Sequence, residues 1–90
     1  MSVTSYERLR MMHRTLLQHP PTTNDLRNLL EELPAQLDSI AASRPALGEE
    51  IASTRPYLQR MAAYITTAPV VDEEQVVQGL HRALAPLFAS

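Results

Sequence analysis

The sequence has no cysteine, no lysine and no tryptophan. Without cysteine it can form no disulfide, and it offers neither a thiolate nucleophile nor a thiolate metal ligand. All eight basic residues are arginine, and the absence of lysine excludes a Schiff-base mechanism. The only aromatic residues are Tyr6, Tyr57, Tyr64 and Phe88. Aliphatic side chains and alanine are therefore expected to fill the core.

A strong charge of one sign and long apolar runs are also missing. The net charge of −2 argues against non-specific nucleic-acid binding, which needs a basic face. No stretch approaches the roughly 18 apolar residues of a membrane span, and the N-terminus lacks the apolar core of a signal peptide. We therefore expect a cytoplasmic protein with no membrane span and no nucleic-acid partner. A length of 90 residues, 44% of them hydrophobic, predicts a single domain over residues 1–90.

An eleven-residue pattern is repeated three times over residues 33–65. Proline recurs in it as Pro34, Pro45 and Pro56. Eleven residues make three helical turns of about 3.67 residues, so the repeat returns to the same helix face. An apolar stripe with a nearly strict seven-residue spacing also runs through this region, and its members are Leu26, Leu30, Leu33, Leu37, Ile40, Leu47, Ile51, Leu58, Met61 and Ile65. That spacing alone would suggest one long coiled-coil helix, but the prolines argue against it.

The apolar spacing predicts helices, and no segment alternates long enough to form a strand. Possible N-caps stand at Thr4, within 22–24 and at Asp72. The fold class we predict is all-α, a small four-helix bundle with short antiparallel connections. Its helices are expected at about 4–18, 23–42, 45–67 and 72–88.

The prolines set the breaks between these helices. A proline inside a helix costs about 3 kcal/mol, whereas one in the first turn loses no hydrogen bond. Ser43 followed by Pro45 resembles a cap and a first turn, and Thr54 before Pro56 repeats that signal. We expect a kink near Pro34, a new helix at Pro45, and a kink or a restart near Pro56.

Catalytic and metal-binding motifs are not visible, so we predict no enzyme, no metal and no cofactor. His13 and His19 are six residues apart, which does not bring two ligands onto one helix face, and His81 has no acidic neighbour on its face. Adjacent glutamates point about 100° apart and do not share a site. The two glycines, Gly48 and Gly79, cannot form a phosphate-binding loop.

Two short segments resemble known families. Asp38-Ser39-Ile40 is similar to the Asp-Ser-Leu site of acyl carrier proteins, but Leu37 replaces the preceding glycine and no acidic helix follows. Residues 45–65 resemble the tandem repeats of exchangeable apolipoproteins, whose helices bind lipid between flanking basic residues. Few basic residues flank the stripe here, so the resemblance is one of periodicity.

The function we predict is that of a small helical interaction module: an adaptor, a dedicated chaperone or a regulatory subunit of a bacterial assembly. Apolar residues beyond the stripe, with Met and Tyr among them, suit an adaptable contact surface. The groove would take a partner helix or a second copy of the chain. The predicted partner-binding residues are Leu47, Ile51, Tyr57, Leu58, Met61, Tyr64 and Ile65.

Two alternatives stand beside this prediction. In the first, residues such as Tyr57 and Met61 simply complete the core. In the second, the chain is a small oligomeric enzyme or ligand-binding bundle with a site between helices. That site would be a pocket containing at least two of Arg44, Arg55, Arg60 and Glu50.

Overall fold

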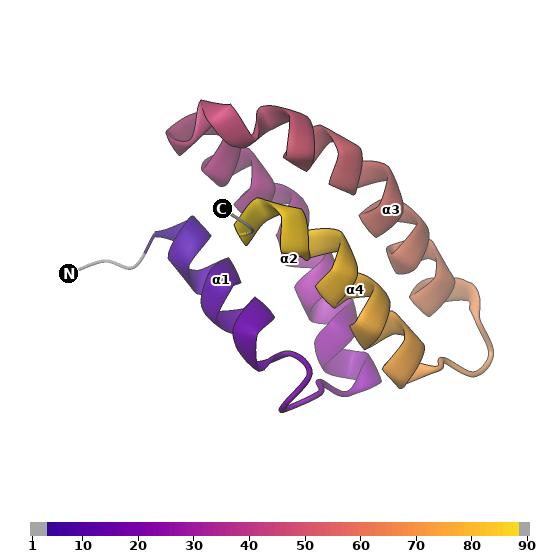
Figure 1. Ribbon diagram of the computed structural model, residues 1–90. Helices are drawn as coiled ribbons and strands as arrows, with labels where there is room; N and C mark the ends of the chain where they lie inside the picture. The colour runs from indigo at the N-terminus through magenta and orange to yellow at the C-terminus, as the bar shows by residue number, and fades with distance from the viewer. Residues whose placement is uncertain (1–3, 89–90) are drawn as a thin grey trace.

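The computed structural model describes residues 4–88, which form four α-helices and one short 3₁₀ helix (Figure 1). The described residues contain no strand, so the prediction of an all-α four-helix fold is confirmed. The elements are α1 (Ser5–Thr15), α2 (Thr23–Ser43), η1 (Pro45–Leu47), α3 (Gly48–Thr67) and α4 (Glu73–Phe88).

The helices run antiparallel to their neighbours and form a ring in which α1 packs on α2, α2 on α3, α3 on α4 and α4 on α1. Side-chain contacts fix this arrangement. Ser5 at the start of α1 reaches Ser39 near the end of α2, and Tyr6 reaches the carbonyl of Leu87 near the end of α4. The bundle measures 38 × 25 × 21 Å.

Three helices begin at the predicted caps. The hydroxyl oxygen of Thr4 accepts a hydrogen bond from the amide of Glu7 over 3.2 Å. Thr22 and Asp25 form a complete capping box at the start of α2. The carboxylate of Asp72 accepts from the amide of Gln75 over 3.2 Å at the start of α4. Such caps satisfy amides that the first helical turn leaves without partners.

The first helix ends earlier than predicted, at Thr15 instead of residue 18. The amides of Gln18 and His19 both donate to the carbonyl of Thr15, over 3.0 and 2.8 Å, which closes the chain into a turn. The proline after His19 disfavours the helical conformation of the residue before it, so the turn is not continued.

The third helix begins later than predicted, at Gly48 instead of Pro45. Ser43 does not cap it, because the Ser43 hydroxyl lies 3.2 Å from the Ser39 carbonyl and 3.3 Å from the Ile40 carbonyl, within the last turn of α2. Pro45 opens a single 3₁₀ turn instead, and no side chain caps it. Serine can form either such a backward bond or a forward cap, and the sequence alone does not distinguish the two.

Pro34 and Pro56 lie inside α2 and α3, which is the placement that the predicted kinks require. Both helices continue past them, so α3 does not restart near Pro56. Thr54 is not a cap, because its hydroxyl donates to the Glu50 carbonyl over 2.8 Å within the same helix. Both proline rings are exposed, so neither displaces a core side chain.

The core is one aliphatic cluster to which all four helices contribute. As predicted from the shortage of aromatics, none of its fully buried members is aromatic. Thr54 is the one buried polar side chain among residues 4–88. The cluster consists of Leu9, Leu16, Leu26, Leu30, Leu33, Leu37, Ile40, Ile51, Leu58, Met61, Ile65, Val76, Val77, Leu80, Leu84 and Leu87.

Candidate functional site

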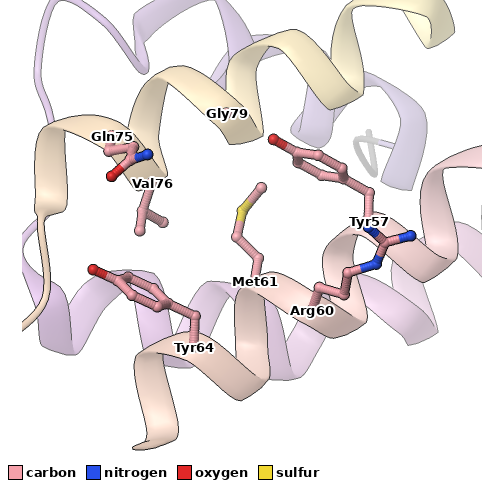
Figure 2. A pocket seen from close by; sticks show the side chains of 7 residues that line it. All are labelled: Tyr57, Arg60, Met61, Tyr64, Gln75, Val76 and Gly79. Atoms are coloured by element: carbon pink, nitrogen blue, oxygen red, sulfur yellow. The ribbon is translucent and has the colours of Figure 1, made fainter. Parts of the chain in front are cut away.

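A groove lies between α3 and α4 and has a volume of about 240 Å³ (Figure 2). Its lining is mostly apolar. We call it the α3–α4 groove and define it by its lining residues, which are Tyr57, Arg60, Met61, Tyr64, Gln75, Val76 and Gly79.

Helical spacing brings these residues together. Tyr57, Met61 and Tyr64 are four and three residues apart, so they share one face of α3. Val76 and Gly79 are three residues apart on the facing side of α4. Because the two helices are antiparallel, Tyr57 lies opposite Gly79 and Tyr64 lies nearer the start of α4.

The absence of a side chain at Gly79 makes room for Tyr57. A Cβ atom added at Gly79 would lie 3.0 Å from the Tyr57 hydroxyl oxygen and 3.4 Å from the terminal methyl of Met61. Tyr57 and Met61 therefore pack directly over the α4 backbone at this point, as Figure 2 shows. Any larger residue at position 79 would push these two side chains outward.

Tyr64 is fixed at the other end of the groove. Its hydroxyl oxygen accepts a hydrogen bond from the amide of Asp72 over 3.3 Å. Asp72 is also the residue whose carboxylate caps α4. Tyr64 is thus tied to the start of α4 while 38% of it remains exposed, and Tyr57 is 43% exposed.

Arg60 gives the groove a positive charge at its edge. It is exposed and forms no ion pair within residues 4–88, where the one ion pair joins Arg55 to Asp38. A guanidinium is well suited to planar contacts with a carboxylate. The groove therefore combines apolar surface, two tyrosine side chains and an available cation.

The structure separates the seven predicted partner-binding residues into two groups. Ile51, Leu58 and Ile65 are buried in the core at 2%, 5% and 2% exposure, and Leu47 is half-buried against it. These four do not line the α3–α4 groove. The groove brings together the other three, which are Tyr57, Met61 and Tyr64. Tyr57 and Tyr64 are exposed, whereas Met61 is a buried core residue at 8% exposure that also lines the groove.

The alternative pocket of arginine and glutamate is not formed by the hollows that the structure describes. Arg60 lines the α3–α4 groove, Glu50 lines a second hollow and Arg55 lines a third between α2 and α3. No one of five hollows among residues 4–88 contains two of the four residues named for that site. Arg44 instead lies over the ring of Tyr6, 3.8 Å from its centroid.

A cluster of rings between α1 and α4 was not predicted from the sequence. His13 stacks on His81 with ring centroids 4.1 Å apart and an angle of 12° between the planes. Burial lowers the pKa of His13, the hydrogen bond to the His81 carbonyl opposes this effect, and the charge of His81 lowers the pKa further. The available signal was that Tyr6 and His13 are seven residues apart, as are His81 and Phe88. This signal is informative only once α1 and α4 are known to pair.

Within the part of the chain that the structure describes, no three His, Asp or Glu side chains gather in a way that would hold a metal ion. None of the described helices combines the length and the hydropathy that a membrane span requires.

No protein-family model matches the chain, and no curated protein or solved structure is significantly similar to it.

Proposed function

We propose that this protein is a helical binding module whose α3–α4 groove takes a short segment of a partner protein. The segment places one apolar side chain over Met61 and Val76 and a carboxylate beside Arg60. The observation that carries this proposal is the combination in one groove of an apolar hollow, two exposed tyrosines and an arginine that forms no ion pair with residues 4–88.

The size and composition of the groove support a protein segment as the occupant. A volume of about 240 Å³ is below the roughly 300–1,000 Å³ of most small-molecule pockets. Tyrosine and arginine are the residue types most enriched at binding hot spots, and methionine adapts its shape to a partner. Tyr57 and Tyr64 thus form two walls, and Met61 forms an adaptable floor.

The charge of Arg60 supports an acidic residue in that segment. Because no carboxylate of residues 4–88 pairs with it, a partner carboxylate would not have to displace an internal one. Charge complementarity of this kind mainly gives specificity and a faster association rate. A second copy of the chain is the competing occupant, and the experiment below distinguishes it.

The proposed role is binding without catalysis, in the cytoplasm. This role would be that of an adaptor, a dedicated chaperone or a regulatory subunit of a bacterial assembly. Each of these would hold a partner through a groove of this kind.

The test begins with peptides selected from a random displayed library on the wild-type protein. Affinities of the selected peptides are then measured by calorimetry for the wild type, Arg60→Glu and the matched control Arg14→Glu, which makes the same charge change at an exposed site on α1. We expect peptides with a large apolar residue close to Asp or Glu. Arg60→Glu should weaken them at least about tenfold, or about 1.4 kcal/mol, and a peptide with Arg in place of its acid should recover the loss.

Three results would overturn the proposal. An equal loss of peptide affinity in Arg60→Glu and in Arg14→Glu would show that only the net charge of the protein matters. Peptides without an acidic residue, unaffected by Arg60→Glu, would place the binding site elsewhere. A dimer in light scattering that Arg60→Glu or Tyr57→Ser dissociates would show that a second copy occupies the groove.

A further inference from the structure

The N-terminal helix α1 is joined to α4 by two pairs of rings. His13 stacks on His81, and about two helical turns away along both helices Tyr6 packs against Phe88 with centroids 5.3 Å apart. Phe88 also contacts His13, with centroids 5.2 Å apart. The histidine pair is thus part of a cluster of four rings that joins α1 to α4.

A hydrogen bond fixes which nitrogen of His13 carries the proton. Its Nε2 lies 2.9 Å from the backbone carbonyl oxygen of His81, and because a carbonyl can only accept, Nε2–H donates. In the neutral ring Nδ1 is then the unprotonated nitrogen. A second proton binds there and puts a positive charge on a ring that is stacked face to face with another imidazole.

The His13 ring has no acidic partner among residues 4–88. Its Nε2 is hydrogen-bonded to a backbone carbonyl, and the one ion pair of these residues joins Arg55 to Asp38. From α4, the charge of His81 acts on His13, and its effect is repulsive. From the end of α2, Arg44 lies over the ring of Tyr6.

The helix that carries His13 is also the one held by the fewest buried residues. Leu9 is the buried residue within α1, and Leu16 follows directly after the helix. Each of the other three α-helices contributes five buried residues. Local opening costs least where few apolar contacts are lost, so α1 is the element that a small electrostatic change moves most easily.

We propose that the stacked pair His13–His81 is a pH-sensitive latch that holds α1 against α4 when neutral and releases α1 when His13 takes up a proton. The latch uses no residue of the α3–α4 groove and does not depend on the function proposed above. Its two states differ in the contact between α1 and α4 while the α2–α3–α4 part of the bundle stays folded.

The direction of the response follows from the burial of the ring. Burial and the charge of His81 lower the pKa of His13 below its usual value of 6.5 in the closed state. The open state has the higher proton affinity, so acidification favours opening. The equilibrium constant for opening rises as the pH falls below 6.5. Its total increase is about tenfold for each unit by which the pKa of His13 in the open state exceeds that in the closed state.

The test is backbone amide exchange on the full chain at about pH 7.5 and pH 5, corrected for the intrinsic pH dependence of exchange. We expect α1 amides to lose protection at the lower pH while α3 amides keep theirs. His13→Gln retains a side-chain donor for the His81 carbonyl but cannot titrate, so it should remove this loss. His19→Gln is the matched control, because His19 is exposed and should leave the response as in the wild type.

A second variant keeps the test decisive if His13→Gln fails to fold. His81→Gln retains the backbone acceptor and removes the repulsive ring, so the histidine resonances of His13 should titrate at a higher pH than in the wild type. The latch is refuted if His13→Gln shows the wild-type acid response. It is also refuted if α1 and α3 lose protection together, or if His81→Gln leaves the titration of His13 unchanged.

Discussion

Replacing Gly79 by alanine tests how Tyr57 is held over α4. Glycine inside a helix costs about 0.5–1 kcal/mol relative to alanine, and Gly79 lies well within α4. The added Cβ would meet the Tyr57 hydroxyl oxygen at 3.0 Å, so this oxygen must move by a few tenths of an ångström. Tyr57 is 43% exposed, and no hydrogen bond to its hydroxyl is formed within residues 4–88, so it can move into water.

We therefore expect Gly79→Ala to stabilise the fold by about 0.5–1 kcal/mol. This raises the melting temperature by a few degrees, because 1 kcal/mol corresponds to about 4–8 °C in a domain of 60–100 residues. Urea unfolding followed by circular dichroism measures the change. Gly48→Ala is the control, because nothing lies within 4 Å of the added Cβ there.

The same change should weaken peptide binding, because it displaces the Tyr57 hydroxyl and so alters one wall of the α3–α4 groove. In a Tyr57→Ala background, Gly79→Ala should stabilise the fold by nearly the full difference in helix propensity between glycine and alanine. The coupling energy between the two substitutions should then be below about 0.5 kcal/mol. A destabilisation of more than about 1 kcal/mol by Gly79→Ala, relieved in the Tyr57→Ala background, would refute the reasoning. It would show that Tyr57 is wedged against α4 and cannot yield.

Three further predictions concern the core, a cap and pH. Leu33→Ala should cost about 2–5 kcal/mol in urea unfolding because Leu33 is fully buried, whereas Leu17→Ala, at a site 51% exposed, should stay within about 0.5 kcal/mol. Asp72→Ala should cost about 1 kcal/mol by removing the cap of α4, and Asp72→Asn should restore most of it; equal losses would mean that charge, and not the cap, is responsible. The pKa of His13 is lower in the folded state than its usual 6.5, so its contribution to stability is complete above pH 6.5 and is lost as the pH falls toward the folded-state pKa. Unfolding of His13→Gln between about pH 7.5 and 5 should lack this component, and an unchanged pH dependence would contradict it.

The sequence predicted the helices well where a local signal was unambiguous. Thr22 and Asp72 cap helices as expected because each precedes an acidic or amide side chain at the right spacing. Ser43 and Thr54 are also hydroxyl residues, and each stands two positions before a proline. Their hydroxyls nevertheless donate hydrogen bonds backward, to carbonyls of their own helices. Whether such a hydroxyl caps a new helix or bonds backward depends on whether the preceding helix continues, and packing decides this.

The candidate site was predicted less completely than the fold. Apolar periodicity predicted the inward-facing side of α3 but did not separate Ile51 and Leu58, which are in the core, from Tyr57, which is beside it. That separation depends on the rotation of α3 relative to α2 and α4. The stack joins His13 to His81, which are 68 positions apart in the sequence, and it forms because α1 pairs with α4. No local pattern encodes such a pairing.

The proposed function requires that the α3–α4 groove binds an apolar side chain next to an acidic one. The most direct measurement is a two-dimensional NMR titration of the labelled protein with a selected peptide, observing backbone amides and methionine methyl groups. We predict that the largest shifts fall on the Met61 methyl and on the amides of Val76 and Gly79, with little change at the Met11 and Met12 methyls of α1. Shifts centred on α1 or on the hollow between α2 and α3, with Met61 and Gly79 unmoved, would contradict the account.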